Sequence, residues 1–129
     1  FGAYEVTAEE IREFAEKYDP QPFHVDEEAA AESMFGGLVA SGWHTASMTM
    51  RLLVDNYLND SGAMGSPGLE RLRWRRPVRP GDVLSVDVEV IDTEVWDDSR
   101  GVVTQAVETQ TDDGETVMTM EALVLYPRR

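Results

Sequence analysis

The chain has 129 residues, 42% of them hydrophobic, which is enough to fold as one domain with a sizeable core. Its 25 acidic residues outnumber 11 basic ones, for a net charge of −14, and this argues against nucleic acid as a partner because phosphate binding needs a basic surface. It contains no run of about 18 apolar residues, so no membrane-spanning helix and no membrane partner are expected.

Cysteine and lysine usage bear on the compartment and the source. The absence of cysteine excludes disulfides and thiolate metal sites, and with no recognisable signal peptide it leads us to expect a cytoplasmic protein. Lys17 is the only lysine, and an acidic, lysine-poor surface suits high salt, which screens self-repulsion. We therefore hypothesise a salt-loving source, for which the melting temperature should rise between low and molar KCl.

Two short helices are predicted near the start of the chain. A capping box at residues 7–10 begins a helix from about 8 to 18, in which apolar residues recur at helical spacing. Two prolines in the segment 19–24 disfavour helix, so a stiff non-helical turn is expected there. Asp26 can then cap a second short helix, from 27 to about 33.

A longer helix is predicted from Gly42 to about Leu58. This stretch is apolar nearly all round, and such helices are normally buried. A flexible loop is expected to follow, to about Gly68.

In the second half of the chain, apolar residues recur at every second position instead of at helical spacing. Apolar and polar residues alternate from Leu84 to Val90, which is typical of a half-buried strand. Further strands are expected at about 69–76, 101–111 and 115–126, with Asp112-Asp113-Gly114 as the last hairpin turn. Helices followed by an antiparallel meander indicate an α+β fold, a curved antiparallel sheet wrapped around one long buried helix. Residues 1–129 are expected to form a single domain.

Asp19 and His24 are the first candidates for chemistry, since carboxylate and imidazole groups move protons well near neutral pH. The segment between them must turn if both are to reach one substrate, and Asp followed by Pro favours a turn. The alternative is a loop that ends a helix, with a solvated Asp19 and a packed His24. Spacing alone favours that alternative.

The start of the predicted long helix is the second candidate. Ser41 suits the N-cap position, and Gly42 lets another group approach the first-turn N–H groups, which suit a developing oxyanion. Close packing of helix against sheet is the other explanation for Gly42, and the residue alone favours it. His44 is expected to be a hydrogen-bonded packing residue.

A metal site would have to gather Asp19, His24, Asp26 and His44. Their spacing matches no usual zinc motif, so we expect no metal. The only basic cluster has two interpretations: the outward face of a strand that neutralises acidic neighbours, which is favoured, or an attractor for the phosphates of a ligand. It consists of Arg71, Arg73, Arg75, Arg76 and Arg79.

Three segments carry a family resemblance. They are Asp19-Pro20-Gln21-Pro22-Phe23-His24, which matches the pattern D-x-N-P-x-H except at Gln21; Phe35-Gly36-Gly37-Leu38-Val39-Ala40-Ser41-Gly42; and Arg73-Trp74 with Pro77-Val78-Arg79-Pro80-Gly81-Asp82. In this order they resemble the MaoC-like dehydratases and R-specific enoyl-CoA hydratases over most of the chain. The resemblance implies a hotdog fold and a homodimer with acyl-thioester sites near the subunit interface.

The resemblance also implies a hydratase or dehydratase that acts on a 2-enoyl-CoA, with no cofactor besides this CoA thioester substrate. Asp19 and His24 would activate the water and return a proton to the α-carbon. The oxyanion and substrate-binding positions would be Gly42 and Ser41, with the Gly42 N–H bonded to the thioester oxygen.

Two residues depart from the family pattern. Gln21 replaces the usual Asn, and Met50 replaces a serine that R-hydratases place in the helix, for which Ser47 lies one turn away. Two alternatives therefore stay open: a hotdog acyl-CoA thioesterase, and a non-catalytic acyl-thioester binding or partner subunit.

Overall fold

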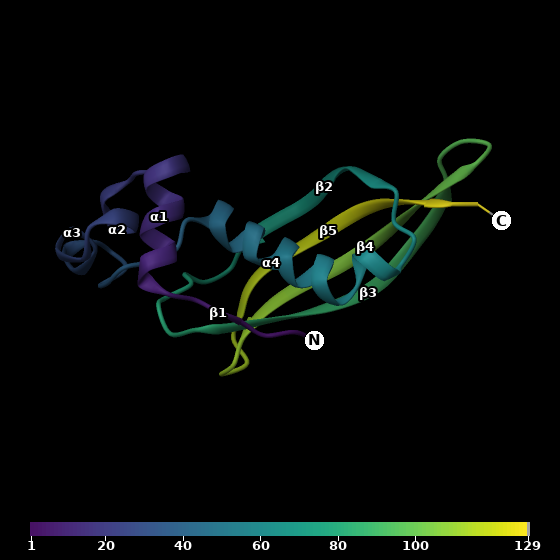
Figure 1. Cartoon of the computed structure of the whole chain (residues 1–129). Coiled ribbons are helices and arrows are strands. Elements are labelled where there is room, and N and C mark those ends of the chain that lie inside the picture. The colour runs from purple at the N-terminus through teal and green to yellow at the C-terminus, as the bar shows by residue number, and fades with distance from the viewer. Residues whose placement is uncertain (129) are drawn as a thin grey trace.

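A long helix lies along one face of a five-stranded antiparallel sheet in the computed structural model, which describes residues 1–128 (Figure 1). The helix is α4 (Gly42–Asn56), and the strands are β1 (Tyr4–Glu5), β2 (Gly65–Trp74), β3 (Val83–Val95), β4 (Arg100–Thr111) and β5 (Thr116–Pro127). The strand order is β1-β3-β4-β5-β2, so β1 and β2 form the edges. The predicted α+β fold, a curled antiparallel sheet with one long helix, is confirmed.

Three short helices gather beyond the N-terminal end of α4 (Figure 1). They are α1 (Ala8–Tyr18), α2 (Pro22–Val25) and α3 (Glu27–Glu32), and a 3-10 turn, η1 (Leu58–Asp60), follows α4. Thr7 and Asp26 cap their helices as predicted, since Thr7 Oγ1 accepts the Glu10 N–H at 3.1 Å and Asp26 accepts two N–H groups of α3. The second half of the capping box is not formed, because the Glu10 carboxylate bonds Tyr4 and His44 instead of the Thr7 N–H. No helix within residues 1–128 is long and apolar enough to cross a membrane.

The prediction of a non-helical turn at 19–24 is wrong in part, because Pro22–Val25 form the helical turn α2. Pro22 occupies the first position of this turn. There its missing N–H would have no partner in any case, and its fixed φ suits a helix. His24 is therefore carried on a helical turn that brings it back toward Asp19.

The prediction that α4 is buried all round is also wrong. The helix ends at Asn56, and its outer side leaves Trp43 59% and Met50 46% exposed, whereas Met48 and Leu52 on the inner side are buried. The sheet covers only one side of a helix. The outer side of α4 is thus an apolar stripe that nothing within residues 1–128 covers.

The predicted strands are present with shifted ends. β2 begins at Gly65 instead of about residue 69, and the two-residue β1 is too short to give a periodic signal. On β3 the alternation holds at Leu84 and Val86 but fails at Val90, which is 53% exposed. The register shifts between Val90 and Asp92, and a bulge there turns side chains away from the core.

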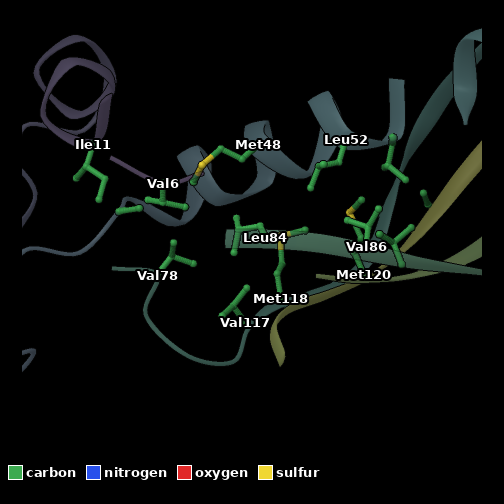
Figure 2. Close-up of a cluster of buried hydrophobic side chains, with 14 of the residues drawn as sticks. Val6, Ile11, Met48, Leu52, Val78, Leu84, Val86, Val117, Met118 and Met120 are labelled. Carbon is green, nitrogen blue, oxygen red and sulfur yellow. The ribbon is translucent and has the colours of Figure 1, made fainter. Parts of the chain in front are cut away.

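The core lies between the inner side of α4 and the sheet (Figure 2). Met48 and Leu52 of α4 point toward Leu84 and Val86 of β3, and Ile11 brings α1 into the same cluster. Burial of such side chains is worth about 1.5–3 kcal/mol each. This packing holds the N-terminal end of α4 firmly against both α1 and the sheet.

Candidate active site

A cleft of about 550 Å³ opens at the N-terminal end of α4, and four separate segments line it. The α1–α2 junction contributes Asp19 and His24, and the start of α4 contributes Ser41 and Gly42. Phe35 forms another part of the wall, and the segment 74–78 at the end of β2 forms the last part. The two sequence-predicted candidate sites therefore share one cavity.

Asp19 and His24 face each other in this cleft, with 3.5 Å between Asp19 Oδ2 and His24 Nε2. His24 Nδ1 lies 2.7 Å from the Val39 carbonyl oxygen. Because a carbonyl only accepts, Nδ1 carries the ring proton of neutral His24 and Nε2 is left as an acceptor beside the carboxylate. Two adjacent acceptors suit a water molecule. Asp19 is not simply solvated, as the alternative had it, because Ser41 and Gln21 bond its carboxylate.

Asp19 is held by side chains on both of its oxygens. Ser41 Oγ donates to Oδ2 at 2.7 Å, and Gln21 Nε2 donates to Oδ1 at 2.6 Å. Burial opposes ionisation, but the hydrogen bonds from Ser41 and Gln21 and the nearby His24 together hold the pKa of Asp19 below its usual value. Gln21, at the position of the usual Asn, thus supports an ionised carboxylate.

Ser41 occupies the N-cap position of α4 but does not cap it with its side chain. Its hydroxyl is turned to Asp19 instead, so the expectation of a serine cap is wrong. No hydrogen bond to the Gly42 N–H is found within residues 1–128. The His44 N–H already bonds the Ser41 carbonyl at 3.0 Å, so in the described part of the chain Gly42 and Trp43, which line the cleft, have the unbonded N–H groups of the first turn. Together with the positive end of the helix dipole these two groups can stabilise negative charge.

Gly42 is required by packing as well as by access. A Cβ atom there would lie 2.5 Å from Cε2 of Trp74, whose ring packs edge-on against Trp43 at 5.3 Å. The packing explanation for this glycine is confirmed, and its service to an oxyanion stays a prediction. The bare backbone lets the Trp74 ring come close and leaves the N–H open to the cleft.

A family model described as "MaoC like domain" matches residues 2–112 of the chain. The chain belongs to this family. A relative, the 3-hydroxybutyryl-CoA dehydratase of Methylorubrum extorquens, is 32% identical over 126 residues, or 97% of this chain and 76% of the relative. The match confirms the resemblance carried by the three motifs.

Solved structures of MaoC-like proteins agree in fold. The MaoC-like dehydratase from Rhodospirillum rubrum is 45% identical with a TM-score of 0.90, covering 99% of this chain and 88% of that one. The (R)-hydratase from A. caviae, involved in PHA biosynthesis, is 28% identical with a TM-score of 0.78, covering 98% and 92%. The expectation of a hotdog fold is confirmed.

The other candidate metal ligands of this MaoC-like chain lie away from the acid–base pair. Asp26 caps α3, and the His44 side chain extends from α4 to α1, with its Nε2 3.0 Å from Glu10 Oε1 and its ring stacked on Phe14. This confirms His44 as a hydrogen-bonded packing residue. Within residues 1–128 no three His, Cys, Asp or Glu side chains are grouped to hold a metal ion.

Ser47 and Met50 are not brought to the cleft. Ser47 lies on the exposed side of α4, where its hydroxyl donates to the Trp43 carbonyl at 2.8 Å. Met50 lines a separate, largely apolar cavity of about 280 Å³ that shares no lining residue with the cleft. Sequence reasoning assigned no role to Val39 or Trp74, although both lie in the motif segments. A contact to a backbone carbonyl and a ring from a distant strand leave no local signal of what they touch.

Proposed function

We propose that this MaoC-like protein is a hydratase or dehydratase that adds water to, or removes it from, the double bond of a 2-enoyl thioester such as a 2-enoyl-CoA. The observation that carries the proposal is the pairing of Asp19 and His24, 3.5 Å apart, in a cleft that also receives the N-terminal end of α4. A relative named as a 3-hydroxybutyryl-CoA dehydratase supports the same chemistry.

In the proposed reaction, Asp19 and His24 Nε2 accept hydrogen bonds from one water molecule. The water oxygen attacks the β-carbon, a proton passes to the pair, and the π electrons move onto the thioester oxygen as an enolate. The Gly42 N–H donates to that oxygen, and the pair returns a proton to the α-carbon. General base catalysis contributes typically 10²–10⁴-fold, and one oxyanion donor about 10²–10³-fold.

The test uses Asp19→Asn and His24→Ala with crotonyl-CoA, following loss of the conjugated thioester absorbance. Each variant is expected to lose about 100-fold or more in turnover, because one acceptor for the water is removed. Melting temperatures near that of the wild type would show that the loss is chemical. Wild-type turnover in both variants would contradict the assignment of Asp19 and His24 as the acid–base pair.

Two alternatives are separated by simple controls. A hotdog thioesterase would release free thiol from a saturated acyl-CoA, whereas a hydratase releases none. A non-catalytic partner subunit would bind the thioester and leave both the double bond and the thioester intact. The retained acid–base pair favours the hydratase over this last alternative.

We also propose that the protein works as a homodimer. The outer side of α4 leaves the apolar Trp43 and Met50 exposed, and β2 is an edge strand whose outer N–H and C=O groups have no strand partner within residues 1–128. Met50 of α4 and Leu69 of β2 line the same cavity, so the two features adjoin. A second copy that covers both would bury them together.

A further inference from the structure

Four arginines lie between residues 73 and 79, and they lack the ion pairs that most of the other arginines form. They are Arg73, Arg75, Arg76 and Arg79. Arg71, just before them, pairs with Glu121. Elsewhere Arg12, Arg51 and Arg100 pair with Glu27, Asp55 and Asp97. Within residues 1–128 none of the four guanidinium groups in the segment 73–79 forms an ion pair with a carboxylate, although the chain holds 25 acidic residues.

Two of these four arginines are not candidates for binding a ligand in the cleft, because Arg79 has a structural role and Arg73 lies outside the cleft. Arg79 donates to the Phe35 carbonyl at 2.7 Å and so holds one wall of the cleft. Arg73 donates to the neighbouring Leu72 carbonyl and lines none of the cavities described above.

Arg75 and Arg76 line the cleft that contains the acid–base pair. Their backbone is tied to β5, since the Arg75 N–H donates to the Val117 carbonyl at 2.7 Å. The Arg75 guanidinium donates through Nε to Thr119 Oγ1 at 3.1 Å, which leaves its outer N–H groups available. The Arg76 guanidinium forms no hydrogen bond or ion pair with any residue in 1–128.

A second, open hollow of about 750 Å³ adjoins the cleft. Its lining comprises Arg75, Arg76, Pro77, Gly114, Glu115 and Thr116, from the end of β2 and the turn between β4 and β5. The residues from Arg75 to Pro77 line both cavities. A ligand that reaches from Asp19 and His24 to the outer hollow must therefore pass the segment from Arg75 to Pro77. Of its two guanidinium groups, that of Arg75 is turned to Thr119, so the one at Arg76 is the better placed to meet the ligand.

We propose that Arg76, with Arg75 beside it, binds a phosphate of the group that carries the acyl thioester. This rests on the proposed function, which sets the thioester at the acid–base pair. A guanidinium matches phosphate with two parallel, charge-assisted hydrogen bonds. The protein has a net charge of −14, so most of its surface repels an anionic ligand. Two arginines at the mouth of the cleft would attract such a ligand to this place.

The test compares thioesters with and without phosphate. Arg76→Ala should raise KM for crotonyl-CoA about tenfold and leave kcat within about twofold, as expected for loss of one charge-assisted contact away from the reacting carbons. Its KM for the crotonyl thioester of N-acetylcysteamine, which has no phosphate, should not change. Arg73→Ala is the matched control and should change neither constant.

Crotonyl-4′-phosphopantetheine identifies which phosphate is bound. If Arg76→Ala raises its KM as well, the contact is to the phosphate at the end of the pantetheine arm, which CoA shares with carrier proteins. If only crotonyl-CoA is affected, the contact is to the phosphates of the nucleotide end, and both results support phosphate recognition. Equal changes with the phosphate-free thioester, or no change with any thioester, would overturn the proposal.

Calorimetric titration with free CoA separates this proposal from the proposed reaction, because it requires no turnover. Arg76→Ala should bind CoA about tenfold more weakly than the wild type and Arg73→Ala should not. If no thioester is hydrated but CoA binding depends on Arg76, the reaction is refuted and the phosphate site stands. If hydration proceeds and Arg76→Ala binds CoA like the wild type, the phosphate site alone is refuted.

Discussion

Ser41 joins the two halves of the candidate site. It is fully buried, and its hydroxyl donates to the Asp19 carboxylate while its backbone leads directly into Gly42. A serine at an N-cap position usually bonds its own helix. By bonding Asp19 instead, Ser41 fixes the distance between the proton acceptor and the proposed oxyanion donor.

Ser41→Ala should therefore change the pH dependence of activity. The hydroxyl stabilises ionised Asp19, so its loss moves the pKa of Asp19 upward. Because the proposed reaction needs the ionised carboxylate, the acidic limb of kcat/KM against pH should move to higher pH. Stability at neutral pH should fall by about 1 kcal/mol, since a buried hydrogen bond is lost.

Ser47→Ala is the matched control, because it removes a hydroxyl from the exposed side of the same helix. Its pH profile and melting temperature should equal those of the wild type. An unshifted acidic limb in Ser41→Ala would contradict the role of Ser41, and a shift in Ser47→Ala would show that this serine reaches the site after all.

Helices α1 and α4 are joined by a buried polar contact behind the cleft. His44 of α4 bonds Glu10 of α1, whose carboxylate also accepts the Tyr4 hydroxyl at 2.5 Å, and the His44 ring stacks on Phe14. Asp19 is the C-cap of α1 and Gly42 the first residue of α4. The contact therefore helps to set how the two halves of the candidate site lie relative to each other.

This contact predicts a loss of stability in mild acid. Burial lowers the pKa of His44 from its usual 6.5, although the hydrogen bond and charge of Glu10 oppose this in part. Below pH 6.5 the unfolded chain therefore binds a proton that the folded chain resists. The contribution of neutral His44 to the free energy of unfolding should be fully present above that pH. It should decline as the pH falls toward the lowered pKa of His44.

The environment of His44 Nδ1 explains why the folded chain resists this proton. The atom is buried and has no hydrogen-bond partner within residues 1–128, so on protonation it would become a buried, unsatisfied donor. Urea unfolding of the wild type and His44→Gln between about pH 8 and about pH 5 measures the effect, because Gln does not titrate there. The variant should lack this part of the decline. Parallel decline in both proteins would assign it to other groups.

The outer surface of the whole molecule favours a second copy. The open edge of β2 lies beside the uncovered stripe of α4, which includes Trp43 and Met50. Edge strands with free N–H and C=O groups pair readily, and adjoining apolar surface adds burial energy of about 25 cal/mol per Å². Both features lie on one side of the chain, as an isologous dimer requires.

Met50→Glu should weaken or abolish the proposed dimer, because it sets a charge in the surface that the second copy would bury. Sedimentation equilibrium should give a dimer mass for the wild type and a monomer mass for the variant. Met34→Glu is the control, since Met34 is 92% exposed outside this surface, and it should remain a dimer. A monomeric wild type, or a Met50→Glu dimer of unchanged affinity, would refute the proposal.

Local patterns accounted for most of the elements. The Thr7 cap of α1, the Asp26 cap of α3 and the Asp112–Gly114 turn depend on residues three or four apart, so the sequence alone determined them. The motif from Asp19 to His24 also predicted that these two side chains lie together, and the structure has them 3.5 Å apart, because a family match does not depend on knowing how the segment turns.

The geometry of the candidate site was decided by contacts between segments that are distant in the sequence. Ser41 and Asp19 are 22 residues apart and His24 and Val39 are 15 apart, so no periodicity predicts that the serine leaves its helix or that the carbonyl selects the histidine tautomer. Burial of α4 could not be judged either, since composition does not say how many sides a sheet will cover. Periodicity reports local backbone preference, whereas a site is made where the packed core brings separate segments together.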